Sequence, residues 1–239
     1  DNNPSGVWTF WSGNGDDPGN WQILNGPEVD IGEWEHIAIT YDNEQEIKQL
    51  YINGELAVES SDSVFPNDTT PFNIGAGQDK GTGFWFVGDL DDIGLWDGAL
   101  SEEDILKAME QGVAAVPSGD GDGDGDGDGD GDGDGDGDGD GDGDGDGDGD
   151  GDGDGDGDGD GDGDGDVRLV AHFSLDSDGN SSEVGGFTAS TVTDVEFGSE
   201  GANANTGTSA TFNGTSSIIQ HDWSADLNPE SFTLALWAR

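Results

Sequence analysis

Short apolar and aromatic runs, each closed by turn-forming residues, fill the first half of the chain. Such runs, separated by Gly, Asn, Asp and Pro, are typical of short β-strands rather than helices. Asn53-Gly54 lies between two of them and predicts a type I′ hairpin turn, because both residues tolerate a positive φ. The predicted strands occupy residues 7–12, 21–24, 34–41, 47–52, 55–59, 71–75, 83–88 and 92–96.

The same pattern resumes after residue 166. Strands are predicted at residues 168–175, 188–197, 209–212, 217–219 and 231–237. Many short strands joined by turns indicate an all-β protein, and we expect an antiparallel two-sheet jelly-roll sandwich.

One short helix is predicted between Ser101 and Gly112. Ser101 can cap its start, with Asp104 at the capping-box position, and Gly112 can end it. The apolar side of this helix would be formed by Leu100, Ile105, Leu106 and Met109.

Between the two strand-rich parts, residues 119–166 are Gly-Asp repeated 24 times. This repeat has no apolar side chain, so no burial offsets the entropy lost on ordering it. We expect a disordered, acidic linker over residues 117–166. Its D-x-D-x-D-G start is similar to an EF-hand loop, but the twelfth position is Gly instead of the bidentate Glu, so no defined ion site is expected there.

Charge narrows the choice of partners. Of the 56 acidic residues, 24 lie in the repeat, so 32 remain elsewhere against five Lys and Arg, a net charge of −27. Nucleic acid and anionic membranes are therefore not expected as partners. Such a charge suits a halophilic or marine protein, where salt screens self-repulsion. No disulfide is possible without Cys, and no apolar run is long enough for membrane insertion.

Motifs on both sides of the repeat resemble those of the laminin-G-like, concanavalin A-like jelly-roll family. The closing half of such a domain is matched by WEHIAITYD (34–42), LYINGEL (50–56), NIG (73–75), GDLDDIGLW (88–96) and ALSEEDI (99–105). The opening half is matched by LVAHFSL (169–175), ATFNG (210–214) and SFTLALW (231–237). The resemblance implies a carbohydrate- or protein-binding module of a secreted or cell-surface protein, often with a structural calcium.

The order of these halves is unusual, since the closing half comes first. We interpret residues 1–116 as the closing half of one domain and residues 167–239 as the opening half of a second. The chain starts without Met and stops inside an apolar run, so we expect it to be a piece of a longer polypeptide. Each half alone would leave strand edges open, so we predict that the two pair as one circularly permuted sandwich.

Three sets of residues are candidates for function. Clustered oxygens on turns suit calcium, although the same acids could simply be solvated; they are Asp176, Asp178 and Asn180, with Asp89, Asp91 and Asp92. Four tryptophans could form a sugar-stacking platform or could fill the core: Trp8, Trp11, Trp21 and Trp85. Glu28, Asp30 and Glu33 resemble the E-x-D-x-x-E motif of laminarinase-type glycosidases, but could be surface acids.

The preferred hypothesis is a non-catalytic ligand-binding or adhesion module, with a glycan or a surface protein as partner. A glycoside hydrolase and a spacer array without ligand are the alternatives.

Overall fold

The computed structural model describes residues 6–13, 21–64, 69–78, 80–81, 84–116, 167–181 and 184–239. The expectation of a disordered linker over residues 117–166 lies outside these described residues. Before the repeat, the strands are β1 (Val7–Gly13), β2 (Trp21–Glu28), β3 (Glu35–Asp42), β4 (Ile47–Ile52), β5 (Glu55–Ser60), β6 (Phe72–Ile74) and β7 (Val87–Trp96). After it they are β8 (Leu169–Phe173), β9 (Thr191–Thr193), β10 (Glu196–Glu200), β11 (Thr208–Asn213), β12 (Ile218–His221) and β13 (Phe232–Ala238).

The helical elements follow from local capping. Helix α1 (Glu102–Gln111) begins where the Ser101 hydroxyl accepts the amide of Asp104, and it ends at Gly112, which has a φ of 89°. This confirms the predicted helix and both of its ends. Two short 3₁₀ turns, η1 (Val113–Ala115) and η2 (Ala225–Leu227), were not predicted.

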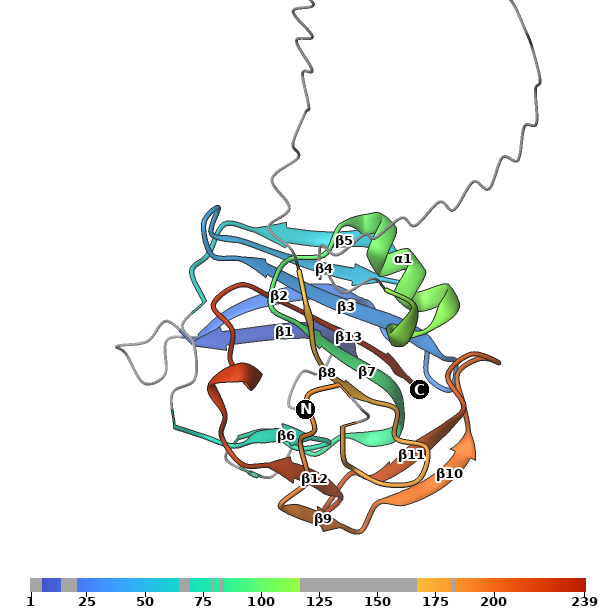
Figure 1. The fold of residues 1–239 in the computed structure, drawn as a ribbon. Helices are drawn as coiled ribbons and strands as arrows, with labels where there is room; N and C mark the ends of the chain where they lie inside the picture. Colours follow the sequence, from blue (N-terminus) through green and yellow to red (C-terminus); the bar gives the residue numbers. More distant parts are fainter. Residues whose placement is uncertain are drawn as a thin grey trace, which may run out of the picture. The chain divides into compact units, whose positions relative to one another are not determined.

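The strands form antiparallel sheets (Figure 1). The largest sheet has the order β10-β11-β7-β13-β3-β4-β5, with β8 paired to β7. Strands β1 and β2 form a second sheet, and β6, β12 and β9 form a third. The predicted all-β antiparallel fold with one short helix is confirmed, while the layer facing the large sheet is divided between two smaller sheets.

Two local predictions need correction. The end of the run predicted at 83–88 and the run predicted at 92–96 belong to the single strand β7, which begins at Val87 and continues through Asp91 and Asp92. Asp92 has a φ of 47°, and the ladder between β7 and β13 shifts register beside it, so a bulge absorbs the irregularity. The run predicted at 188–197 is divided at Asp194, whose φ of 48° marks a turn between β9 and β10.

Strands from before and after the repeat are interleaved in the sheets. Strand β13 pairs with β3 on one side and with β7 on the other. Strands β8 and β11 also pair with β7, and β12 pairs with β6. The described residues on both sides of the repeat therefore belong to one compact unit. Their assignment to the halves of two consecutive family domains stays a prediction.

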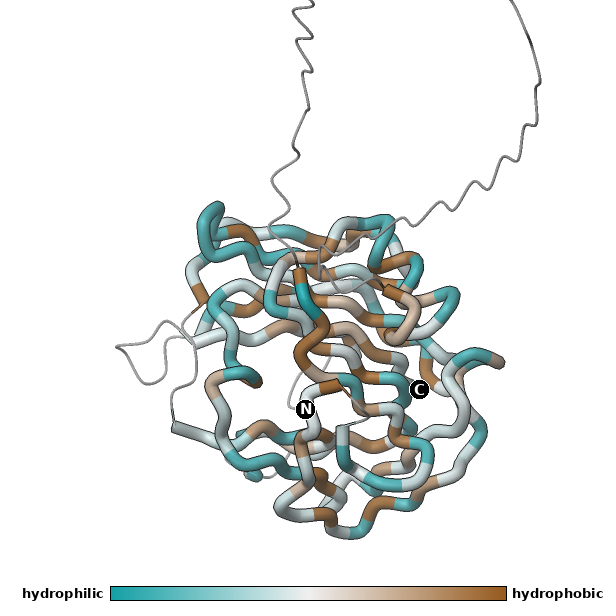
Figure 2. The backbone as a smooth tube through the Cα atoms, in the orientation of Figure 1, coloured by the Kyte–Doolittle hydropathy of each residue, from teal (hydrophilic) through white to brown (hydrophobic). Residues whose placement is uncertain are grey.

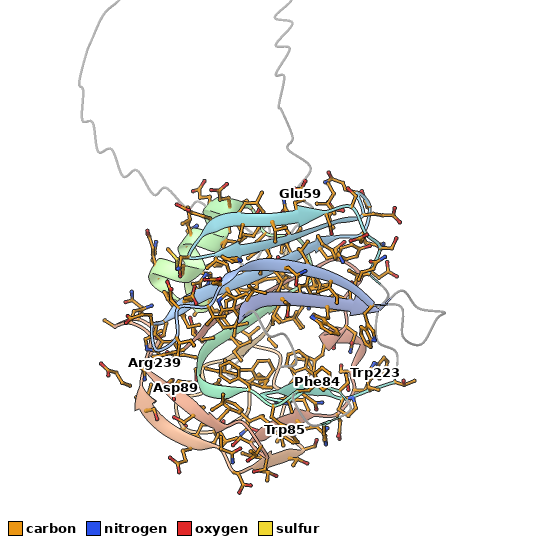
Figure 3. The ribbon with its side chains drawn as sticks, turned by 180° about the vertical axis from the view of Figure 1, so that it is seen from behind. Glu59, Phe84, Trp85, Asp89, Trp223 and Arg239 are labelled. Atoms are coloured by element: carbon orange, nitrogen blue, oxygen red, sulfur yellow. The ribbon has the colours of Figure 1, made fainter. Side chains whose placement is uncertain are left out.

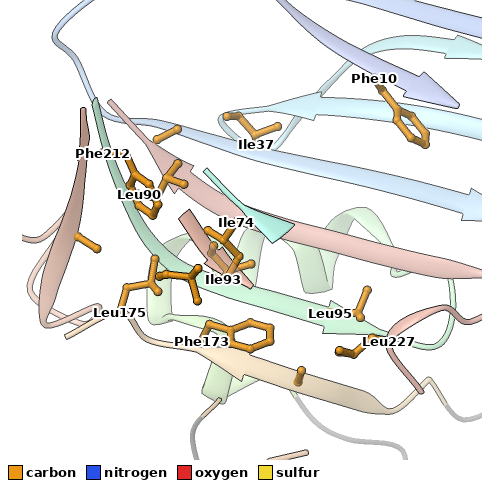
Figure 4. Close-up of a cluster of buried hydrophobic side chains, with 14 of the residues drawn as sticks. Phe10, Ile37, Ile74, Leu90, Ile93, Leu95, Phe173, Leu175, Phe212 and Leu227 are labelled. Atoms are coloured by element: carbon orange, nitrogen blue, oxygen red, sulfur yellow. The ribbon is translucent and has the colours of Figure 1, made fainter. Parts of the chain in front are cut away.

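Two hydrophobic clusters use opposite faces of the large sheet, because neighbouring strand residues point in opposite directions. The inner cluster joins all three sheets and includes Phe10, Leu24, Ile37, Leu50, Ile74, Leu95, Phe173, Phe212 and Ile219 (Figure 4). The outer cluster lies under α1 and includes Tyr51, Trp96, Leu100, Ile105 and Ala235. Because both faces of the large sheet are covered, its central strands β3 and β7 are buried at most positions on either face, and hydrophobic residues (brown) run through the folded part of the chain (Figure 2).

Candidate functional site: an exposed aromatic patch and a buried acidic cluster

The outer face of the β1–β2 hairpin carries large apolar side chains that contact solvent. On β1, Phe10 and Ser12 point into the protein, so Trp11 between them points outward and is 42% exposed. On β2, Leu24 points inward, whereas Trp21 and Ile23 are 53% and 44% exposed. The register places Trp11 opposite Ile23, and Trp21 opposite Gly13.

A third segment completes this surface. Residues 84–86 run antiparallel to residues 75–77, held by hydrogen bonds from the Gly77 amide to the Phe84 carbonyl (2.7 Å) and from the Phe86 amide to the Gly75 carbonyl (2.9 Å). Phe84, labelled in Figure 3, is 41% exposed. Its ring centroid lies 6.5 Å from that of Trp11 in an edge-on arrangement. The Trp11 and Trp21 centroids are 6.3 Å apart. We call Trp11, Trp21, Ile23 and Phe84 the aromatic patch.

The four tryptophans predicted as a platform separate into two groups. Trp11 and Trp21 lie together in the aromatic patch. Trp8 instead packs against the inner cluster, and its indole Nε1 donates to Glu35 Oε2 at 2.9 Å, which suits a packing role. Trp85 is half-buried and its backbone bridges to Ala76. Alternation along β1 could have distinguished Trp11 from Phe10, whereas the place of Phe84 in the patch depends on the pairing of residues 84–86 with 75–77, which the strand predicted at 83–88 does not by itself reveal.

The second feature of interest is Asp91 on β7, which is fully buried. Its Oδ2 accepts the amide of Ala202 (2.9 Å) and the hydroxyl of Thr206 (2.7 Å). Its Oδ1 is buried and has no hydrogen-bond partner in the described part of the chain. Burial raises the pKa of Asp91 to about 6; the two hydrogen bonds oppose this shift, and the nearby carboxylates of Asp92 and Asp176 add to it.

Asp176 faces the same loop from the other half of the chain. Its Oδ1 accepts the amide of Thr208 at 2.6 Å. A Cβ added to Gly207 would lie 2.2 Å from Asp176 Oδ1, and one added to Gly201 would lie 3.1 Å from Asp91 Oδ2. The glycines of the 201–208 loop therefore allow its backbone to approach both carboxylates closely.

The other four predicted metal ligands are engaged elsewhere. Asp178 Oδ1 accepts the amide of Asn180, and Asn180 Oδ1 accepts the amide of Ala189, both at 2.9 Å. Asp89 forms an ion pair with Arg239 at 2.9 Å.

Asp92 also makes two contacts of its own. Its Oδ1 lies 2.6 Å from His172 Nε2, and its Oδ2 accepts the Val113 amide at 2.9 Å. Within the described ranges, no three His, Cys, Asp or Glu side chains form a group that could hold a metal. The unpaired Asp91 oxygen and Asp176 nevertheless fit the oxygen-ligand preference of calcium, with backbone carbonyls needed to complete a site.

The acids of the E-x-D-x-x-E motif lie at the end of β2 and in the turn that follows. Glu28 is the last residue of the strand, and the Glu33 amide donates to the Asp30 carbonyl at 3.1 Å. All three side chains are exposed, and Gly32 between them has a φ of 91°. The hydrolase alternative requires these acids to lie on a strand that faces a cleft. Instead, they lie at the end of β2 and in the surface turn that follows it.

A cleft of about 380 Å³ lies elsewhere, near the segment that carries Phe84. Apolar side chains line most of it, including Phe72, Leu95, Phe232 and Leu234, with Gln78 and Glu230 also in the lining. None of the three acids of the motif contributes to this cleft.

Comparison with known proteins agrees with this fold. Residues 1–106 match the laminin-G-like family described as the concanavalin A-like lectin/glucanases superfamily. The match does not extend to residues 167–239, so a second copy is not shown.

Two curated relatives share similarity with part of the chain. The sushi, von Willebrand factor type A, EGF and pentraxin domain-containing protein 1 of Rattus norvegicus is 35% identical over 96 residues, and that of Mus musculus is 34% identical. These matches span 36% of this chain and only 3% of either relative. No solved structure matches the chain significantly. Within the described residues, no helix has the length and apolar character needed to span a membrane.

Proposed function

We propose that this protein is a non-catalytic carbohydrate-binding module of a secreted or cell-surface protein, with the aromatic patch as its binding surface. The observation that supports this most is the convergence of three exposed aromatic rings from β1, β2 and residue 84. Large apolar side chains gathered on one exposed surface commonly mark an interaction site. The match of residues 1–106 to the concanavalin A-like lectin/glucanases superfamily is consistent with this role.

Aromatic rings suit a sugar ligand because the C–H faces of a pyranose can stack on them while its hydroxyls stay hydrated. Covering one half-exposed ring removes enough apolar surface to contribute about 1–2 kcal/mol. Three rings give about 3–6 kcal/mol before the entropy lost on binding is subtracted, so a short oligosaccharide should bind with a dissociation constant of about 1 mM or weaker. Such weak binding becomes useful on a polymer, where neighbouring sites engage repeatedly.

The test is affinity electrophoresis of the full chain through gels that contain polysaccharides. A bound polymer retards the protein, and Trp21→Ala is expected to abolish most of that retardation. Leu56→Ala is the matched control, because Leu56 is 46% exposed and lies on β5 in the large sheet. Equal retardation of the wild type and Trp21→Ala by every polymer that binds would refute the assignment of the patch.

We also propose calcium as a structural ion near Asp91 and Asp176. A cation there would give the unpaired Asp91 oxygen a partner and would reduce the repulsion between the two carboxylates. Calcium is expected to raise the melting temperature of the wild type relative to EDTA. Asp91→Asn should lose this response while it keeps an oxygen for the Ala202 amide.

A further inference from the structure

We propose that the polysaccharide taken by the aromatic patch is electrically neutral, and that sulfated or uronic-acid polymers are rejected. This inference rests on the proposed function and specifies the ligand class of the same surface. It depends on two observations: the side-chain types on the outer face of the β1–β2 hairpin, and the ion pairs that the Lys and Arg side chains form.

Over residues 9–13 and 21–25, the described outer face of the hairpin carries no charged side chain; exposed Glu28, which is paired with Val7, lies beyond this stretch at the far end of the hairpin. Besides Trp11, Trp21 and Ile23, the strand alternation places Thr9 and Asn25 on this face, where they are directly opposite each other. Thr9 is partly exposed and Asn25 is exposed. In a chain with this many acids, a strip with only aromatic, aliphatic, hydroxyl and amide groups offers stacking and neutral hydrogen bonds to a ligand.

Four of the five Lys and Arg side chains, which an anionic glycan would need as partners, already form ion pairs within the protein. Sulfates and carboxylates are recognised mainly by Arg and Lys, whose charge offsets the loss of ligand hydration. Lys48 is fully buried, donates to Ser12 Oγ at 3.1 Å and lies 3.4 Å from Asp62. Lys107 lies 3.6 Å from Asp104.

Both arginines are also paired. Arg168 lies 3.2 Å from Asp97, and Arg239 contacts Asp89 at 2.9 Å while its guanidinium lies 4.8 Å from the ring centroid of Trp34. Lys80 is the fifth cation; it is exposed, and no ion pair of Lys80 is found among the described residues. One lysine cannot offset the field of a protein whose residues outside the repeat carry a net charge of −27.

The experiment uses pairs of polymers that share a backbone and differ in charge, with the full chain. Suitable pairs are hydroxyethyl cellulose with carboxymethyl cellulose, and dextran with dextran sulfate. Binding is measured at 50 mM and 500 mM NaCl. Charges interact over a Debye length of only about 10 Å at 0.1 M salt, and this distance shortens at higher salt, so the higher concentration weakens electrostatic repulsion of the polymer. We expect at least one neutral polymer to bind at both salt concentrations, and its charged counterpart to bind at least tenfold more weakly at 50 mM.

The outcomes separate this inference from the proposed function. Binding of a charged polymer that equals or exceeds that of its neutral partner, and that Trp21→Ala removes, would overturn the inference and leave the carbohydrate-binding role standing. If no neutral or charged polymer binds through Trp21, the proposed function fails and the inference fails with it.

A gain-of-function variant gives an independent test. Asn25→Lys adds a cation to this uncharged stretch of the face and should raise the affinity for the charged member of the bound pair at least threefold at 50 mM NaCl. Leu56→Lys adds the same charge on β5, outside the patch, and should leave that affinity unchanged. An equal gain in both variants would show that net charge, not the composition of this face, sets the preference, and would overturn the inference.

Discussion

The aromatic patch and Asp91 violate opposite rules of protein architecture. Trp11, Trp21 and Phe84 keep apolar surface in water, whereas Asp91 is removed from water with one carboxylate oxygen unpaired in the described structure. Large apolar groups are usually buried, and buried polar groups are usually paired. Each region therefore has an unfavourable local environment that an added partner would relieve: an apolar ligand face for the patch, and a cation for Asp91.

The two regions also differ in what they should do to the fold. Asp91 connects β7 to the loop after β10 and so takes part in packing. The patch lies on the outer face of the β1–β2 hairpin and at Phe84 beside it, and its rings are about half exposed. Substitutions at Asp91 should change stability more than ligand binding, and substitutions in the patch should do the reverse.

The largest effect is expected for Asp91→Ala. The Ala202 amide and the Thr206 hydroxyl would lose their acceptor inside the protein, so the free energy of unfolding should fall by about 2–4 kcal/mol. Urea denaturation in EDTA measures this change. Asp91→Asn is the control, since it keeps one acceptor oxygen and removes the buried charge, and should be near or above the wild type in stability. Equal stabilities of Asp91→Ala and the wild type would contradict the structural role.

Acid should destabilise the fold through His36 on β3, a second buried polar group. Burial lowers the pKa of His36 to about 4 from 6.5, and this shift is only partly offset by Asp92. Between these values the unfolded chain binds a proton that the folded protein does not, so stability falls as the pH drops from 6.5 to 4. The loss attributable to His36 should approach about 3 kcal/mol. His36→Gln should show a shallower pH dependence in urea titrations, and an identical slope would contradict the assignment.

In the patch, Trp21→Ala should reverse this pattern. Loss of one stacking ring should weaken glycan binding about tenfold, equivalent to about 1.4 kcal/mol. The free energy of unfolding should change by less than about 0.5 kcal/mol, because Trp21 is 53% exposed. Calorimetric titration and urea denaturation of the same sample measure both quantities. A stability loss as large as that of Asp91→Ala would show that Trp21 is a packing residue.

The smallest effect is expected in the turn after β2. Glu28→Gln alters an exposed side chain, so both stability and glycan binding should stay within about 0.5 kcal/mol of the wild type. Incubation with a β-glucan, followed by reducing-sugar measurement, tests the hydrolase alternative in the same variant. Turnover by the wild type that disappears in Glu28→Gln would establish catalysis. The non-catalytic role proposed for the aromatic patch would then be wrong.

Elements with a local cause could be predicted from sequence. The Asn53-Gly54 turn has φ values of 51° and 80°, as a type I′ hairpin requires, and Ser101 caps α1 through its own hydroxyl. Strand β7 was predicted as two runs, because the partners that let it continue through Asp91 and Asp92 come from beyond residue 167. Local sequence carries no information about such distant partners.

The candidate sites show the same limit. Residue type and alternation along β1 could separate Trp11 from Trp8, but Phe84 joins the patch only through the pairing of residues 84–86 with 75–77. Six metal ligands were proposed from clusters of acids in sequence, and the structure brings only Asp91 and Asp176 to one loop. Clusters in sequence mark available oxygens, but the direction of each side chain is set by its neighbours in space.

The position of β13 between β3 and β7 has a consequence for biosynthesis. A ribosome must translate the whole Gly-Asp repeat before the residues of β13 exist, so the sheet cannot close while the first segment is emerging. Contacts this distant along the chain give a high contact order and slow folding. During that delay β3 and β7 lack their shared neighbour, and the nascent protein is then most exposed to aggregation through unpaired strand edges.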